Sequence, residues 1–318
     1  MGYPRSHLVA PGAAGTYHCV ARCVRRAFLC GEDAVSGRCF DHRKAWLESR
    51  LIELADIFSI SVLAYAVMSN HVHAVLHCAP ALAASWSDEE VTARWVRLFP
   101  VRINGCLDPE ACRRKVCALA GNPARIALLR QRLGDLSWFM RCLSEPLARL
   151  ANQEDDCTGR FWEGRYRCQA LLDDEAVLAC MTYVDLNPVR AGIAQDLPES
   201  AHTSVHARLG APAHDLDQPI DAVAGPSRPG FLPLSSRQYI ELVDWSGWQL
   251  HPNQRGCIAH NAPPPLPRGI DTAHWLAQVR GVELRYCRAI GSAQVLLDKA
   301  REMGQRWLMV RRVERCVA

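Results

Sequence analysis

The sequence contains very little lysine, because three of its 37 basic side chains are Lys and 34 are Arg. Its 15 cysteines include no Cys-x-x-Cys pair, so the paired knuckles of a structural zinc site are missing. No apolar run approaches the roughly 18 residues that identify a membrane-spanning helix. The first residues carry no apolar signal-peptide core, so we expect a cytoplasmic protein with reduced thiols and no membrane contact.

Length and composition indicate a globular protein. The chain has 318 residues, of which 49% are hydrophobic and 22% charged, enough for one large domain or for a domain with a smaller companion. The net charge of +4 is only mildly basic. Arginine binds phosphate through two parallel hydrogen bonds, but a GC-rich genome also favours arginine codons. The arginine excess is therefore compatible with nucleic-acid binding and gives it only weak support.

Hydrophobic periodicity predicts alternating strands and helices up to residue 187. Ser69-Asn70 reads as the turn of a hairpin, and Ser87 with Glu90 reads as a capping box that opens a helical segment. This order predicts an α+β fold with a ferredoxin-like antiparallel sheet and helices on one face. Residues 16–30 are predicted to form a strand that runs into a basic turn. The other predicted strands are 59–67, 71–77 and 160–172, and the predicted helices are 41–57, 85–135, 137–152 and about 175–187.

Composition divides the chain near residue 205. Residues 1–205 read as one domain with a helical insertion at about 80–136, and residues 206–234 read as a linker because they are rich in Pro, Gly and Ala. Residues 235–318 are expected to form a small, mainly helical region, in which three short helices leave room for a DNA-binding helix–turn–helix at 271–303. The helices predicted there are 235–245, 271–279, 283–290 and 292–315.

Two histidines share one face of the predicted strand 71–77. Side chains alternate along a strand, so His71 and His73 point the same way with alpha carbons roughly 7 Å apart. Val72, Ala74 and Leu76 then lie on the opposite face, against a helix. Both imidazoles can therefore converge on one ion. The motif is short and common, and two solvent-facing histidines are the alternative interpretation.

A tyrosine and an asparagine lie one helical turn apart near the end of the predicted helix 175–187. Tyr183 and Asn187 are four residues apart and so share a face. Pro188 ends the helix nearby, which places Asn187 in the last turn with its side chain free to reach outward. Taken alone, a core tyrosine with a bonded hydroxyl and a C-cap asparagine explain the pair at least as well.

Together, the four groups suit a metal-assisted site. His71, His73 and Asn187 offer neutral ligands and leave positions open for water and phosphate oxygens, which suits Mg²⁺ or Mn²⁺. Such an ion neutralises charge that develops on a phosphodiester, while Tyr183 attacks and keeps the 5′ phosphate as a covalent ester. A free phenol has a pKa of about 10, so a proton acceptor is needed. Asp185 and Glu163 are the two candidates.

Four blocks of the sequence, in this order, resemble a known family, the single-tyrosine HUH transposases, and within it the group associated with repetitive extragenic palindromes. The resemblance covers about residues 15–205. It implies a ferredoxin-like nuclease domain, a divalent metal, single-stranded DNA with hairpins and a 5′-phosphotyrosine intermediate. Compact members lack the insertion at 80–136, and many carry Gly where this chain has Cys23. The blocks are Tyr-His-Cys-Val-Ala-Arg-Cys-Val-Arg-Arg (17–26), Asn-His-Val-His-Ala-Val (70–75), Gly-Arg-Phe-Trp-Glu-Gly-Arg-Tyr-Arg (159–167) and Tyr-Val-Asp-Leu-Asn-Pro-Val-Arg-Ala-Gly (183–192).

By that resemblance, Tyr183 is the nucleophile, His71 and His73 are metal ligands, and Asn187 is the third ligand. Basic and aromatic side chains nearby are predicted to contact DNA, with arginines on phosphates and Trp162 stacked on an unpaired base. Core packing is the alternative for Trp162, and a solvated side chain is the alternative for Arg190. The predicted DNA contacts are Arg22, Arg25, Arg26, Arg160, Trp162, Arg165, Arg167 and Arg190.

The leading functional hypothesis is a transposase, that is, a DNA endonuclease and strand-transferase. Its expected partner is single-stranded DNA with hairpin or palindromic repeats, bound by a monomer or a homodimer. The alternative is a host-adapted DNA-binding regulator with the same fold that no longer cuts DNA. A metal-dependent hydrolase of small phosphoesters is a third hypothesis, but it would not need the cluster of arginines and tryptophan. The presence of all four site groups favours the enzyme that cuts DNA.

Overall fold

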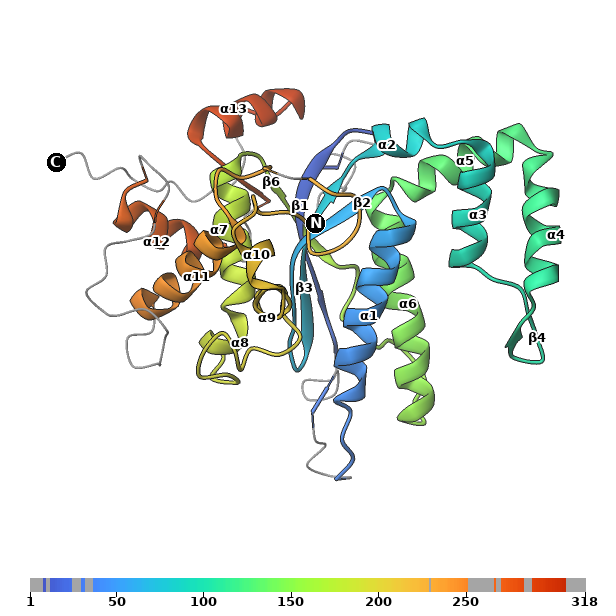
Figure 1. The fold of residues 1–318 in the computed structure, drawn as a ribbon, viewed down its shortest axis with the longest axis horizontal. Helices are drawn as coiled ribbons and strands as arrows, with labels where there is room; N and C mark the ends of the chain where they lie inside the picture. The colour runs from blue at the N-terminus through green and yellow to red at the C-terminus, as the bar shows by residue number, and fades with distance from the viewer. Residues whose placement is uncertain are drawn as a thin grey trace.

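A five-stranded sheet lies at the centre of the protein, with its strands in the order β2-β3-β1-β6-β7 (Figure 1). The computed structural model describes residues 8–9, 12–24, 30–31, 37–228, 230–250, 266, 270–282 and 288–306. Neighbouring strands are antiparallel, except that β7 runs parallel to β6. The predicted α+β class is confirmed. The strands are β1 (Gly15–Arg22), β2 (Ile60–Val67), β3 (His71–Cys78), β6 (Arg167–Leu171) and β7 (Ala289–Ile290).

Helices cover both faces of this sheet. α1 (His42–Ile57) and α6 (Leu136–Glu154) lie side by side on one face, as predicted for the two helices that connect the strands (Figure 1). α7 (Asp174–Asp185) packs on the other face against β2, β3 and β6, so the helices are not confined to one face as the predicted architecture had them. Every residue of α7 from Ala176 onward is buried. Because most of these residues are apolar, the helix must be covered on all sides, which explains the additional layer.

The two sheet faces carry different side chains. Val72, Ala74 and Leu76 belong to the core shared with α1 and α6, as the alternation along β3 predicted. His71 and His73 alternate with them and therefore face α7. The side that faces α1 and α6 is mainly apolar, whereas the α7 side combines a second apolar core with polar groups.

Most predicted elements before residue 187 form near their predicted bounds. α3 (Asp88–Leu98) begins after Ser87, whose Oγ accepts a hydrogen bond from the Glu90 N–H at 3.1 Å, as the capping box predicted. The strand predicted at 160–172 is shorter, because only Arg167–Leu171 pair as β6. Before it, Gly159 adopts a φ of 104°, and the chain makes a single bridge from Trp162 to Cys23.

Residues 80–134 form the predicted helical insertion, which extends from the sheet beyond α1 and α6 (Figure 1). Asp108 and Asn122 each precede a proline and cap a helix, accepting backbone N–H bonds at 2.8 and 3.0 Å. A small hairpin, which was not predicted, lies between two of the helices. The elements are α2 (Pro80–Ser85), α3, β4 (Arg102–Ile103), β5 (Cys106–Leu107), α4 (Pro109–Ala120) and α5 (Pro123–Leu133).

The C-terminal region packs against the same sheet. The predicted linker at 206–234 includes α10 and the end of α9, and Val62 of β2 bonds to its Val223 and Ala224. α11 and α12 pack against α7 (Figure 1). The helix predicted at 283–290 is wrong at its end, where Ala289–Ile290 form β7, so a strand separates the helices proposed as a helix–turn–helix. The helices are α8 (Asn187–Arg190), α9 (Ser204–Leu209), α10 (Ala213–Leu216), α11 (Ser236–Leu250), α12 (Thr272–Gly281) and α13 (Ala293–Glu302).

The division of the chain into domains at 205 and 234 stays a prediction. Residues 307–315, the end of the last predicted helix, lie outside the described residues. Within the described ranges, no helix is long and apolar enough to cross a membrane.

Candidate functional site

Two rows of the sheet bring the predicted histidine ligands together with arginines. Arg22 on β1 lies opposite His71 on β3. In the next row, His73 lies opposite Val20, and Val20 lies opposite Arg167 of β6 on its other side. Residues directly opposite each other share a sheet face, so the two arginines lie on the face of the histidines. Arg22 and Arg167 are exposed, which gives this face a cationic edge.

α7 places Tyr183 over these rows. The centroid of its ring lies 5.8 Å from that of His73, in an edge-on arrangement. The His71 and His73 rings are 4.8 Å apart, also edge-on. Tyr183 and His73 are both buried, with 5% and 4% of their surfaces exposed. The structure therefore gathers three of the four predicted groups from segments far apart in the sequence.

Asn187 begins the short helix α8 instead of closing α7. α7 ends at Asp185, and Asn187 follows a break in the helix. Its Nδ2 donates to the backbone oxygens of Tyr183 at 3.0 Å and Val184 at 3.4 Å. This fixes the side chain on the turn that carries Tyr183. It also occupies the amide nitrogen and leaves Oδ1, the atom that binds cations, for another partner.

A third histidine, His18, belongs to the same cluster, and the sequence pattern alone did not reveal it. His18 lies on β1 opposite Gln169 of β6. Its Nδ1 is 2.8 Å from Gln169 Oε1, and its Nε2 is 2.9 Å from His73 Nδ1. The His18 and His73 rings stack with centroids 5.1 Å apart. Thr16, His18 and Val20 alternate along the strand, but only the strand register shows that His18 reaches His73.

These bonds determine which nitrogen of each ring carries the proton. Gln169 Nε2 donates to the backbone oxygen of Val282 at 3.4 Å, so Oε1 is the end that faces His18. His18 must therefore donate from Nδ1 and accept at Nε2, where it receives the proton of His73 Nδ1. A neutral imidazole carries one N–H, so His73 Nε2 holds a lone pair. Within the described part of the chain, this buried nitrogen has no hydrogen-bond partner.

His71 also has an unprotonated Nε2, and here one neighbouring residue sets the tautomer. Its Nδ1 donates to Asn70 Oδ1 at 2.5 Å, which leaves its Nε2 unprotonated. Metal-binding histidines are usually held in this way, with one ring nitrogen donating to a neighbour and the other free for the ion. Both residues of the His-x-His motif therefore have the tautomer that a metal requires.

Burial keeps the three rings neutral. It lowers the pKa of His18 and of His71 to about 4, and nearby Arg22 adds to the effect at His71. Burial also lowers the pKa of His73 well below its ordinary value, helped by the neighbouring histidines and arginines. Because a histidine must be neutral to bind a metal, these rings need lose no proton at neutral pH.

The donor set fits a weakly held divalent cation. In the ranges that the structure describes, no three His, Cys, Asp or Glu side chains are grouped to hold an ion. His71 and His73 would thus need Asn187 Oδ1 and oxygens from water or substrate to complete the coordination. Mg²⁺ and Mn²⁺ commonly bind in this shared manner. The observation that supports the fit is the buried Nε2 of His73, which has no hydrogen-bond partner in the described ranges.

Asp185 cannot be the proton acceptor for Tyr183, although the sequence made it a candidate. Two residues apart on a helix, the side chains point to opposite sides. The Asp185 carboxylate accepts hydrogen bonds from Ser204 Oγ at 2.5 Å, the Val205 N–H at 2.9 Å and the Tyr239 hydroxyl at 2.5 Å. Burial raises the pKa of this carboxyl, and these three bonds lower it. Its role is to join α9 and α11 to α7.

The other candidate acceptor and the predicted arginines lie around the site. Glu163 is exposed, and its backbone N–H donates to the backbone oxygen of Arg22 at 2.9 Å. Because Arg22 lies opposite His71, Glu163 is near the site and remains a candidate proton acceptor for Tyr183. The Arg190 guanidinium lies 4.7 Å from the centroid of the Tyr183 ring. Cations therefore approach Tyr183 and the histidines from both the helix and the sheet.

The remaining predicted DNA contacts lie before β6 or outside the described residues. Arg160 and Arg165 are exposed. The Trp162 indole N–H donates to Ser144 O at 2.9 Å, and its ring packs edge-on against Phe161 at 5.0 Å. This packing accounts for Trp162 without DNA, and its stacking role stays a prediction. Arg25 and Arg26 lie outside the described residues.

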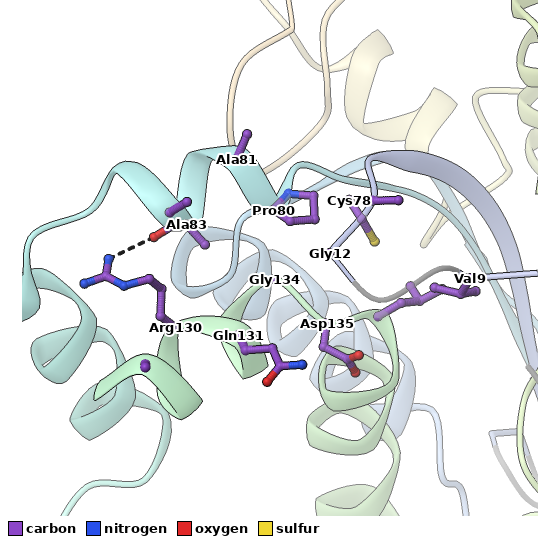
Figure 2. A pocket seen from close by; sticks show the side chains of 14 residues that line it. Val9, Gly12, Cys78, Pro80, Ala81, Ala83, Arg130, Gln131, Gly134 and Asp135 are labelled. Carbon is purple, nitrogen blue, oxygen red and sulfur yellow. Dashed lines mark hydrogen bonds between the residues drawn. The ribbon is translucent and has the colours of Figure 1, made fainter. Parts of the chain in front are cut away.

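A cavity of about 380 Å³ lies elsewhere in the fold, between the end of β3 and helices α2, α5 and α6. Figure 2 shows Cys78, Pro80 and Gly134 in its wall, with Arg130 bonded to the Ala83 oxygen at 3.0 Å. Cys78 is the last residue of β3, whereas His71 is the first. This cavity is thus remote from the histidines and is not part of the Tyr183 site.

No protein-family model matches the sequence, and no curated protein matches it. Among solved structures, a REP-associated tyrosine transposase bound to a REP hairpin is similar over 61% of this chain and 79% of that one. The sequence identity is 12% and the TM-score is 0.31. A TM-score this low establishes neither family nor function, so the function must be inferred from the site.

Proposed function

We propose that this chain is a metal-dependent, single-stranded DNA endonuclease and strand-transferase of the transposase type. The observation that carries the proposal is His73 Nε2, an unprotonated nitrogen that is buried beside the ring of Tyr183 and has no hydrogen-bond partner among the residues that the structure describes. Leaving a buried polar atom unpaired costs roughly 1–3 kcal/mol. A buried polar atom without a partner requires an explanation, and for His73 Nε2, which lies beside His71 and Tyr183, a bound cation is the explanation that fits the neighbouring groups.

Three side chains would hold the cation, namely His71 and His73 through Nε2 and Asn187 through Oδ1. Mg²⁺ or Mn²⁺ bound there would neutralise the negative charge of the phosphate under attack. His18 holds the His73 ring in the required tautomer, and Gln169 holds His18. Through this chain of hydrogen bonds, the sheet orients a ligand before any substrate arrives.

Tyr183 is the proposed nucleophile. Its hydroxyl oxygen forms a bond to the phosphorus of one phosphodiester, and the bond from that phosphorus to the 3′ oxygen breaks. The phenol gives up its proton, and the departing 3′ oxygen takes one up to become a hydroxyl. The 5′ phosphate stays on Tyr183 as an ester, which conserves the bond energy. Attack by another 3′ hydroxyl reverses the step and joins a new DNA end.

The arginines account for the choice of DNA over a small phosphoester. Arg190 over the Tyr183 ring and Arg22 beside His71 favour negative charge where the phenolate and the phosphate meet. Arg167 continues the cationic edge along β6 and can bind a neighbouring phosphate of the same strand. The proposed partner is single-stranded DNA with hairpin or palindromic repeats, bound in the cytoplasm by a monomer or a homodimer.

Covalent trapping tests the proposal. The protein is incubated with single-stranded hairpin DNA from beside its own gene, with Mg²⁺ or Mn²⁺, and is run on a denaturing gel. A label at the 3′ end should move with the protein, whereas a label at the 5′ end should not, because Tyr183 keeps the 5′ phosphate. The adduct should require metal and should be lost in Tyr183→Phe and His73→Ala. Tyr166→Phe, which changes a half-buried tyrosine, is the matched control.

Two other outcomes would replace the proposal. Binding without any adduct, across several hairpins and both metals, would identify the non-cutting DNA-binding regulator. Metal-dependent hydrolysis of a small phosphodiester that survives in Tyr183→Phe would identify the hydrolase.

A further inference from the structure

The positive charge of the chain is concentrated in part of the helical insertion. Residues 99–134, which follow α3 and extend through α5, contain seven Arg or Lys and two Asp or Glu, a net charge of +5. The 37 basic and 33 acidic residues of the whole chain leave 30 and 31 for the remainder, a net charge of −1. Residues 99–134, called the basic arm below, therefore account for all of the excess positive charge.

We infer that the basic arm is a second DNA-binding surface, which contacts phosphates of the DNA that flanks the segment held at Tyr183. This inference rests on the proposed function, because it assumes that the Tyr183 site acts on DNA. It adds a surface on the other side of the molecule, which the Tyr183 site does not require for its own chemistry.

The central helix of the arm has its basic side exposed. No residue of α4 is buried. Val116 and Leu119 are half-buried on the side of the helix that contacts the rest of the insertion, whereas Arg113 and Arg114 are exposed. The Arg114 side chain is 64% exposed and that of its neighbour Glu110 is 72% exposed, with an N–O distance of 3.1 Å. Such an exposed pair is worth little, so the arginine is available to a phosphate.

Arg102 and Lys115, at the hairpin end of the arm, bond to uncharged backbone oxygens. Arg102 donates to the backbone oxygen of Gly105 at 3.2 Å, and Lys115 donates to that of Phe99 at 2.7 Å. Asn104 and Gly105 have φ values of 52° and 82°, the left-handed backbone that a tight hairpin turn uses. Carbonyl partners restrain both side chains and carry no charge of their own. The positive charge of this end therefore remains available to an anion.

A polyanion fits this surface better than a second copy of the chain does. Two copies that met through the arm would bring together two segments of charge +5, which repel. DNA carries a phosphate for every nucleotide, and displacement of its counterions favours binding to clustered arginines. Ile103 and Leu107 at the hairpin are 53% and 55% exposed, so apolar contact with sugars is available beside the cations.

The arm and α7, the helix that carries Tyr183, lie on opposite sides of the sheet, with α1 and α6 between the sheet and the arm (Figure 1). The hairpin end of the arm and α8, beside the site, both lie in the lower half of that view. One DNA molecule can contact both only if it extends past α6. The length of the flanking DNA should therefore decide whether the arm contributes to binding.

The test compares Arg113→Gln/Arg114→Gln with Arg237→Gln/Arg301→Gln, a control that removes the same charge from α11 and α13. Binding is measured by fluorescence anisotropy at several salt concentrations, for a short hairpin and for the same hairpin with a long flank. For the long DNA, the arm variant should lower the slope of log affinity against log salt by about 2, one for each phosphate that the two arginines no longer bind. The short hairpin, the adduct yield at saturating DNA and the thermal midpoint should not change.

Equal affinity of the arm variant and the control for the long DNA, at every salt concentration, would overturn the inference. So would a change in sedimentation without a change in DNA binding, because the arm would then contact a second copy. If the proposed function itself were wrong, the wild type would form no adduct with any hairpin, which distinguishes that outcome from the loss of the arm alone. A normal adduct with no effect of the arm variant removes only the second surface.

Discussion

The polar groups on the two sides of α7 differ in their hydrogen bonding. On one side, the Asp185 carboxylate accepts three hydrogen bonds and joins α9 and α11 to the helix. On the other, Tyr183 lies beside His73, whose Nε2 is buried and has no hydrogen-bond partner among the described residues. Both sides are buried, so burial does not distinguish structural from functional groups. The difference lies in the two groups themselves, because the Asp185 carboxylate has hydrogen-bond donors and His73 Nε2 has no partner among the described residues.

We therefore expect the Asp185 side of α7 to stabilise the fold and the Tyr183 side to carry out the reaction. Substitutions on the first should unfold the protein without changing the reaction of the folded molecules. Substitutions on the second should stop the reaction without unfolding the protein.

The largest effect is expected from Tyr183→Phe. Adduct formation with hairpin DNA should fall at least about a thousandfold, as for the loss of other nucleophiles. The free energy of unfolding in urea should change by less than about 1 kcal/mol, because the ring and its contacts are retained. A variant that lost stability in proportion to activity would show that the hydroxyl has a structural role.

The next largest effect is expected from Asp185→Ala. It leaves the hydroxyls of Ser204 and Tyr239 and the Val205 N–H buried without their acceptor, so the free energy of unfolding should fall by about 3 kcal/mol. Adduct formed per folded molecule, measured at low temperature, should stay near the wild-type value. Asp298→Ala, at a half-exposed surface position, is the control and should change neither quantity.

Acid should destabilise the protein through its buried histidines. The pKa of His18 is lowered to about 4 in the folded state, against about 6.5 when unfolded, so the unfolded chain binds the proton more tightly. The stability that this histidine contributes is complete above pH 6.5 and is lost as the pH falls towards 4, by roughly 3 kcal/mol in all.

Urea unfolding at several pH values between 7 and 4 checks this prediction. In His18→Gln, the free energy of unfolding should fall less steeply with decreasing pH than in the wild type. His214→Gln removes a histidine that is 80% exposed and should leave the slope unchanged. Equal slopes for wild type and His18→Gln would contradict a buried, neutral His18.

The smallest effect is expected from Gln169→Met, which removes the acceptor that sets the His18 tautomer. Affinity for Mn²⁺, measured by electron paramagnetic resonance in a Tyr183→Phe background with bound hairpin, should fall about tenfold. Gln169→Glu keeps the acceptor and should bind Mn²⁺ better than Gln169→Met does. Equal affinities in the two variants would show that the tautomer is set without Gln169.

Local periodicity predicted much of this arrangement. Alternation along 71–77 placed His71 and His73 on one face, and helical spacing placed Asn187 with Tyr183. The roles of His18 and Gln169 were not predictable, because they depend on the register of β1 with β3 and β6, strands that are distant in the sequence. Asp185 was misjudged because its nearness to Tyr183 in sequence concealed its opposite direction on the helix.

The insertion was predicted as helical, but its arrangement was not. The β4–β5 hairpin and the exposed side of α4 depend on how the helices pack, which periodicity alone does not specify. The concentration of positive charge is visible in the sequence once the bounds of the insertion are known.

Mass-spectrometric mapping of the covalent adduct tests the central claim most directly. The wild type is trapped with hairpin DNA and Mn²⁺, the DNA is trimmed by nuclease, and the modified peptide is sequenced. We expect a nucleotide attached through its 5′ phosphate to Tyr183 and to no other of the seven tyrosines. A nucleotide on Tyr166 or on another tyrosine, or an adduct that forms equally well in His73→Ala, would contradict it.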